Sequence, residues 1–222
     1  MRLRVAAVVV IVLLLASCAH TRKPALTPSP TTAGRQVNPG NIRRVGRDLP
    51  PGYEVSAFPG VAAPSALWGV AGQGAATPAR CAALADPAGG HGQAAQGISG
   101  SGPGGIVYAV VVAAPTGQVL LDQSLVAQCR QWTMTGGAAT ARVHLIGSPR
   151  IDGAETLGMA TDIATSVEGG NVILSRVSTF TAYLGNYYAF TALISDPGAP
   201  PSSLKPEFAS DLLVKAVSAL RA

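Results

Sequence analysis

Residues 155–195 read ETLGMATDIATSVEGGNVILSRVSTFTAYLGNYYAFTALIS, and this stretch decides the fold class. In its first part, large apolar residues fall on one parity: Leu157, Met159, Ile163 and Val167. Such a period of two is typical of a strand with one buried face. Gly-Gly-Asn at 169–171 and Leu-Gly-Asn at 184–186 are turn sequences. The stretch therefore predicts three consecutive antiparallel strands, the last two covering 172–183 and 187–195.

Further strands are expected outward from this stretch, at 139–146, 106–114 and 53–58. Residues 106–114, IVYAVVVAA, are almost all apolar and rich in β-branched side chains. This composition predicts a central strand that is buried on both faces. Residues 86–105 are rich in glycine, and we expect a loop there. The sheet should thus have about five to six strands.

Helices are expected at 78–85, 122–132 and 206–221, with a helical turn at 64–70. In the last helix, Pro206 suits the first helical position. Its apolar residues form one stripe: Phe208, Leu212, Leu213, Ala216, Val217 and Leu220. The predicted class is α+β, a mainly antiparallel sheet with helices packed on one face. Residues 38–222 are enough for one such domain.

The first 17 residues have the pattern of a secretory signal. Arg2 and Arg4 precede an apolar run over 5–15, and small residues follow. The run is much shorter than the roughly 20 apolar residues that a membrane-spanning helix needs. Leu15-Ala16-Ser17-Cys18 resembles the lipobox of bacterial lipoproteins, which implies cleavage before Cys18 and attachment of lipid to its thiol. The alternative is an ordinary secreted protein in which Cys18 has no such role.

Residues 18–37 are rich in proline and threonine and should form a basic, extended tether. The whole chain has a net charge of +5. From Asp48 onward, however, eight Lys and Arg stand against eleven Asp and Glu. The positive charge therefore lies next to the expected anchor, where it could attract anionic headgroups or simply keep a linker solvated. We expect a membrane partner through the lipid and no nucleic-acid partner.

Three cysteines are present, Cys18, Cys81 and Cys129. Lipidation of the first leaves two, and an exported domain lies in an oxidising compartment. Cys81 and Cys129 should therefore form a disulfide; the alternative is two separate buried thiols. Cysteine and histidine do not cluster with metal-ligand spacing, so we expect no metal and no other cofactor.

The motif GSGPGG at 100–105 matches the letters of a dinucleotide-binding loop. Such a loop must follow a strand and open a helix. Here the motif follows a loop and precedes a strand, and Pro103 lacks an N–H. A flexible connection is the better interpretation.

Catalytic patterns are sparse in the expected domain. A Ser-His-Asp hydrolase would have to use His91 or His144, and no nucleophile-elbow motif is present. Asp152 and Glu155 flank Gly153 and fit a solvated turn better than a carboxylate pair. We therefore expect no enzyme activity and assign no catalytic residue. Several aromatic residues could line a ligand cleft, although core packing explains them more simply: Trp68, Trp132, Tyr183, Tyr187 and Tyr188.

Eight short motifs carry a family resemblance: 48–54 (DLPPGYE), 66–69 (ALWG) after Pro64, 81–84 (CAAL), 101–108 (SGPGGIVY), Cys129 with 132–133 (WT), 158–161 (GMAT), 179–185 (TFTAYLG) and 208–213 (FASDLL). With these motifs the chain resembles a family of mycobacterial lipoproteins whose extracellular domain has no assigned function. That family is distantly similar to PknH-like extracellular sensor domains. The resemblance implies an antiparallel sheet with helices and an open cleft, and it transfers no catalytic residue.

The sequence thus leads to a functional expectation. The chain should be a lipid-anchored lipoprotein on the extracytoplasmic face of the cell membrane. Its domain should bind a small, lipidic or cell-wall ligand in a sensor-like way. A structural or protein-interaction module of the envelope is the alternative, and a hydrolase is a weaker one. The sequence predicts neither the ligand-binding residues nor the oligomeric state.

Overall fold

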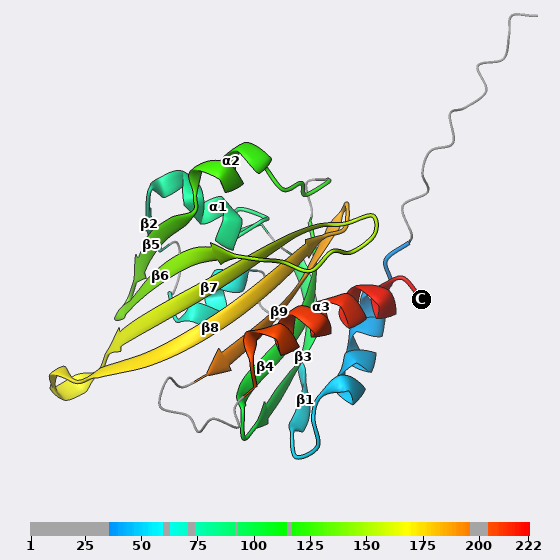
Figure 1. Cartoon of the computed structure of the whole chain (residues 1–222), viewed down its shortest axis with the longest axis horizontal. Helices are drawn as coiled ribbons and strands as arrows, with labels where there is room; N and C mark the ends of the chain where they lie inside the picture. The colour runs from blue at the N-terminus through cyan, green and yellow to red at the C-terminus, as the bar shows by residue number, and fades with distance from the viewer. Residues whose placement is uncertain (1–35, 60–62, 71–73, 92, 115–116, 196–203) are drawn as a thin grey trace, which may run out of the picture. The chain divides into compact units, whose positions relative to one another are not determined.

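One antiparallel sheet organises the described part of the chain (Figure 1). The computed structural model describes residues 36–59, 63–70, 74–91, 93–114, 117–195 and 204–222. The expected signal peptide, Cys18 and nearly all of the 18–37 tether lie outside these residues. Within them, nine strands follow the spatial order β1-β3-β4-β9-β8-β7-β6-β5-β2.

The strands are β1 Glu54–Phe58, β2 Ala75–Thr77, β3 Gln93–Gly102, β4 Gly105–Ala113, β5 Gln131–Gly136, β6 Ala139–Ile146, β7 Glu155–Ser166, β8 Val172–Tyr183 and β9 Tyr187–Ser195. The α-helices are α1 Ala82–Ala85, α2 Gln123–Gln128 and α3 Pro206–Leu220. The 3-10 helices are η1 Pro39–Asp48, η2 Pro64–Trp68, η3 Ala79–Cys81 and η4 Glu168–Gly170.

The three strands predicted from residues 155–195 are confirmed as β7, β8 and β9. They pair with their neighbours in antiparallel register over almost their whole length, and β8 and β9 have the predicted bounds. The turn between β8 and β9 contains Gly185 at φ +75°, a backbone conformation that glycine adopts without steric cost. The alternation in 155–167 and the two turn sequences were together sufficient to predict this part of the sheet.

The expected number of five to six strands is wrong, because β2, β3 and β5 were missed. Strand β3 lies in the region predicted to be a glycine-rich loop. A Cβ atom at Gly97 would lie 2.5 Å from the carbonyl oxygen of Ala109, so the residue permits a close approach between strands. Strand β5 begins where the helix predicted for 122–132 was expected to continue. The helix ends at Gln128, and the β-favouring residues Trp132 and Thr133 join the sheet.

Helices cover both faces of the sheet rather than one. Side chains alternate between faces along each strand. On one face, Val107, Ala109 and Val111 of β4 pack in a cluster with α3 and η1; we call it the α3 face. On the other, the disulfide face, β5–β9 pack in a cluster with Trp68 of η2 and Leu84 of α1. The central strands are apolar on both sides, so burial of both sides requires cover on each.

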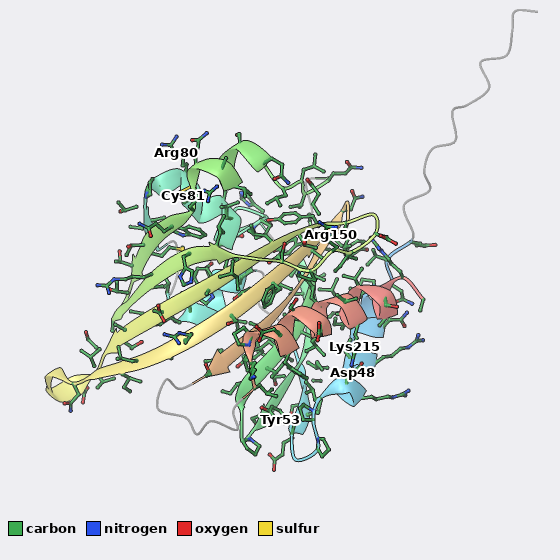
Figure 2. The ribbon with its side chains drawn as sticks, in the orientation of Figure 1. Asp48, Tyr53, Arg80, Cys81, Arg150 and Lys215 are labelled. Carbon is green, nitrogen blue, oxygen red and sulfur yellow. A yellow bond between two sulfur atoms is a disulfide. The ribbon has the colours of Figure 1, made fainter. Side chains whose placement is uncertain are left out.

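Helix α3 has the predicted apolar stripe. Leu212, Leu213 and Leu220 are at most 1% exposed, and the helix packs mainly on β4, β8, β9 and η1. Figure 2 shows Lys215 of α3 close to Asp48 of η1, and their Nζ and Oδ1 atoms lie 3.0 Å apart. Both side chains are partly exposed, so this ion pair adds little stability. The apolar contact holds η1 and α3 together.

A disulfide joins Cys81 and Cys129, as predicted, with Cα atoms 5.6 Å apart. Both residues are fully buried on the disulfide face. The bond ties η3 to the end of α2 and so fixes the cover of that face. Among the described residues, no helix combines the length and the hydropathy that a bilayer crossing requires.

Candidate functional site

The cover on the α3 face ends near β8, so the same face of β5, β6 and β7 is open to solvent. Strand register assigns the following residues to this open face: Gln131, Thr133 and Thr135; Thr140, Arg142, His144 and Ile146; Gly158, Ala160, Asp162 and Ala164. Arg142, His144 and Asp162 are exposed, whereas Val143 and Ile163, on the other face, are buried. A sheet that is apolar on one side therefore presents charged groups on the other.

Two rows of neighbouring residues cross the open face. In the first row, Arg142, Asp162 and Arg176 are partners on β6, β7 and β8. In the second, His144, Ala160 and Ser178 are partners on the same strands. Neighbouring strands lie about 4.8 Å apart. Side chains in each row are therefore close enough to contact one ligand.

One cation of this face is paired and another is not. The Arg176 Nε atom donates to Asp162 Oδ1 at 2.8 Å. Arg142 is the partner of Asp162 on β6, whereas Arg176 is its partner on β8. Within the described ranges, Arg142 nevertheless forms no ion pair. Its guanidinium keeps its donors for a carboxylate, a phosphate or a hydroxyl. Arg142 is thus the strongest candidate for contact with a ligand.

The open face is hollowed beside the N-terminus of α3. This α3 hollow has a volume of about 620 Å³. Its wall includes His144, Asp162, Arg176 and Ser178 of the sheet, with Pro206, Glu207 and Ser210 of the helix. A second hollow of about 530 Å³, the β8 hollow, is lined by Thr140, Arg142, Asp162, Leu174 and Arg176, among others. A third of about 420 Å³ lies over β5 and β6 and again includes Arg142, His144 and Asp162. The shared Asp162 joins the three into one surface.

Ser178 places a hydroxyl in the wall of the α3 hollow. The residue is only 4% exposed, and the described part of the chain gives its Oγ no hydrogen-bond partner. This Oγ is not among the buried polar atoms that lack a partner in the described part of the chain, so the hydroxyl is accessible from the hollow. Ser178 is therefore well suited to bind a polar group that enters the hollow.

The two candidate histidines have different surroundings. His144 lies on the open face and shares the α3 hollow with Asp162 and Ser178. Among the described residues, however, the structure records no hydrogen bond from its imidazole to either. His91 follows α1 and is exposed. It lies near Asp86, whose carboxyl has a raised pKa because burial has the largest effect. Hydrogen bonds from backbone N–H groups and the nearby His91 lower the pKa by less.

The remaining candidates from the sequence have structural roles. Asp152 and Gly153 offer their backbone oxygens to the Arg221 guanidinium at 2.6 and 2.8 Å. Glu155 accepts a hydrogen bond from Gln123 at 2.9 Å. Four of the five candidate aromatic residues are at least 94% buried: Trp68, Trp132, Tyr183 and Tyr188. The fifth, Tyr187, packs against the cluster on the α3 face. Core packing, the simpler interpretation, is confirmed for them.

The GSGPGG motif is explained by close packing against Tyr53, which Figure 2 labels near one end of the sheet. A Cβ atom at Gly102 would lie 2.6 Å from the Tyr53 ring. The backbone N–H of Gly104 donates to the Tyr53 hydroxyl at 3.1 Å. The motif forms the β3–β4 hairpin and opens a strand, not a helix. It therefore lacks the geometry of a dinucleotide site.

Sequence reasoning did not identify most residues of the hollows. Arg142, Asp162, Arg176, Ser178 and Glu207 carry no motif. The available signal was the parity of 139–146, which puts Arg142 and His144 on one polar side. Across the described ranges, no group of three or more His, Cys, Asp or Glu residues could hold a metal ion.

The fold and the open face define a class: an α+β domain built on one antiparallel sheet, with one face covered and the other covered in part. The chain belongs to the family of a domain of unknown function, DUF5642, which matches residues 38–221. This match confirms the resemblance drawn from the eight motifs. Among curated proteins, none is significantly similar to the chain.

The solved structures to which the chain is similar include the following two. One is an uncharacterised protein of Mycobacterium smegmatis, an ortholog of Rv0999, with a TM-score of 0.62 at 22% identity. The alignment covers 86% of this chain and all of that one. The other is the extracellular domain of PknH from Mycobacterium tuberculosis, with a TM-score of 0.39 at 14% identity over 82% of this chain and 93% of that one. The first comparison shows a shared fold.

Proposed function

We propose that the chain is a lipid-anchored, extracytoplasmic binding domain whose ligand occupies the open face. The lipobox-like sequence at 15–18 supports the anchor. The three joined hollows support the binding site. The proposal contains no catalytic step, because no observation in the hollows favours one.

The observation that carries the proposal is Arg142, which has no ion-pair partner among the described residues and lies beside hollows whose walls include charged and hydroxyl groups. An arginine binds carboxylate and phosphate oxygens through two parallel N–H donors. Ser178 and His144 add further hydrogen-bonding groups, and Glu207 supplies an acceptor at the helix end. These walls suit a small polar ligand or a cell-wall fragment with an acidic group. They suit an acyl chain less well, because the chain would desolvate the charges.

The binding claim is tested by native mass spectrometry of the purified chain after incubation with fractionated envelope extracts. We expect a retained small molecule. Arg142→Gln should weaken its binding about 10- to 150-fold, the equivalent of one hydrogen bond to a charged group. Arg150→Gln is the matched control, because Arg150 is exposed and does not line the described hollows. Equal retention by wild type and Arg142→Gln would contradict the proposed site.

The anchor is tested separately with Cys18→Ala. Without its thiol the chain cannot receive diacylglycerol. We expect release from membranes or accumulation of the uncut precursor, measured by fractionation and intact mass. Unchanged mass and membrane association would show that Cys18 has no such role.

A further inference from the structure

The β7–β8 hairpin extends beyond both of its neighbours in the sheet. Strand β9 ends at Ser195, which pairs with Arg176, and β6 begins at Ala139, which pairs with Thr165. Strand β8 nevertheless continues from Arg176 back to Val172, paired with β7 alone. In Figure 1 this end of the hairpin, coloured yellow, projects away from the other strands. Within the described ranges, no strand pairs with the outer edge of 172–175.

In the part of the chain that the structure describes, the backbone of this edge has a defined set of groups without a hydrogen-bond partner. The Asn171 carbonyl accepts a hydrogen bond from Val167 N–H at 2.9 Å, so residue 171 faces β7. In an antiparallel ladder, successive residues face opposite neighbours. Val172 and Leu174 therefore direct their N–H and C=O groups away from β7. Arg176, two residues after Leu174, follows the same alternation. Its carbonyl faces β9, where it accepts a hydrogen bond from the Ser195 hydroxyl at 3.5 Å.

The side chains around these groups are apolar on both faces. Val172, Ile173 and Leu174 are 55, 58 and 59% exposed, and Val167 is 37% exposed. They are half of the eight large apolar side chains that are exposed in the described part of the chain. Register places Val172 and Leu174 on the α3 face, and Ile173 on the disulfide face. From 167 to 175, Glu168 is the one charged residue.

We infer that residues 172–175 form a strand-addition site for an extended, uncharged, apolar segment of another protein. Such a segment would continue the line of β9 beyond Ser195. Its backbone would bond to Val172 and Leu174, and its alternating side chains would cover Leu174 on one face and Ile173 on the other. This arrangement satisfies both the free backbone groups and the apolar side chains.

Lipid acyl chains would satisfy only part of the surface, because they would cover the side chains but desolvate the four outward backbone groups without bonding to them. A short strand from another protein bonds to these groups and also covers the apolar side chains. A second copy, paired edge to edge, could reach the same groups, so the test treats a dependence on protein concentration as the outcome that identifies it. Leu174 also lines the β8 hollow, but the strand-addition site rests on the backbone edge of β8 and does not require a ligand in the hollows.

The test is hydrogen exchange on the full chain, ¹⁵N-labelled, with the probe acetyl-Thr-Val-Ile-Val-Thr-amide. We expect the peptide to slow exchange at the Val172 and Leu174 amides. Exchange at Ile173 and Ser175, whose N–H groups already face β7, should change little. The control peptide carries N-methyl groups at both valines, which removes two N–H donors from one edge of the extended peptide. It should bind to the chain at least about tenfold more weakly.

Two variants of the chain complete the test. Leu174→Pro removes an outward N–H without removing a bond to β7, and Leu174→Lys keeps the N–H and places a charge on the edge. Each should raise the dissociation constant about tenfold or more. Leu120→Lys is the control, because Leu120 is 70% exposed but lies outside the hairpin. Unchanged amide spectra away from the hairpin show that the variants fold.

Four outcomes would overturn the inference. The first is no change on addition of the peptide. The second is a shift of side-chain signals, by peptide or by phosphatidylcholine vesicles, without protection of the two amides, which would indicate a purely apolar contact. The third is protection that grows with protein concentration alone, which would indicate a second copy. The fourth is equal affinity for wild type and both Leu174 variants.

Discussion

Two buried threonines should respond in opposite ways to the same substitution. Thr179 of β8 and Thr191 of β9 are both 0% exposed. The Thr191 hydroxyl donates to the Ala209 carbonyl of α3 at 2.6 Å. The Thr179 hydroxyl points to the disulfide face and has no partner in the described part of the chain. Valine has nearly the same shape without the hydroxyl, so the exchange isolates the hydrogen bond.

The expected changes follow from that difference. A typical hydrogen bond contributes about 1 kcal/mol, so Thr191→Val should lower the free energy of unfolding by about that amount. A buried polar group without a partner costs about 1–3 kcal/mol. Thr179→Val removes this cost and should raise the free energy of unfolding by about 1–2 kcal/mol. The two variants should therefore differ by about 2–3 kcal/mol with opposite signs.

Urea denaturation followed by tryptophan fluorescence measures both changes, since Trp68 and Trp132 are buried. Equal slopes in wild type and variants would establish that only stability changed. A loss of stability in Thr179→Val similar to that in Thr191→Val would refute the reasoning, because the Thr179 hydroxyl would then have a partner in solution. The interpretation of the Thr179 hydroxyl as unbonded would have to be abandoned.

Three further predictions concern stability. Gly102→Ala should cost about 1–3 kcal/mol through overpacking against the Tyr53 ring, and urea titration should show a smaller loss when Tyr53→Ala is combined with it. Replacing Cys81 and Cys129 together by alanine should cost about 4 kcal/mol, because the disulfide links residues 48 positions apart; an unchanged melting midpoint would contradict this. Burial raises the pKa of the Tyr183 phenol above its usual value near 10. Above about pH 10 the unfolded chain therefore loses this proton while the folded chain keeps it, and stability falls by about 1.4 kcal/mol per pH unit. Tyr183→Phe should remove that part of the decline, and parallel decline in both proteins would show that the phenol ionises in the folded state.

The central strands could be predicted because their own residues contain the signal. Strands β7, β8 and β9 alternate or are strongly β-favouring, and turn glycines separate them. Strand β3 could not be predicted in the same way. Its glycines are required by Tyr53 and Leu49, which lie close to Gly102 and Gly100 in the fold but distant in sequence. A residue chosen for a tertiary contact carries no local pattern.

The candidate site depended on two facts that the sequence does not contain. The first is register: a slip of one residue would move Arg142 and His144 to the buried face. The second is where α3 stops covering the sheet. The apolar stripe of α3 predicts that the helix packs on a sheet, but it does not specify which strands. Because the sequence does not show where the cover by α3 ends, it identifies Asp162 and Arg176 only as polar residues on two strands and not as parts of a site.

Helix α3 places the start of the domain and the hollow at opposite ends of one element. Asn38 N–H donates to the Leu220 carbonyl at 2.8 Å, near the C-terminal end of the helix. The hollow is lined by Pro206 and Ser210 near the other end. Fifteen helical residues span about 22 Å, so Asn38 and the hollow lie near opposite ends of that length. Anchor and binding site should therefore be separable, and a chain with Cys18→Ala should keep the affinity of wild type for any ligand that Arg142 holds.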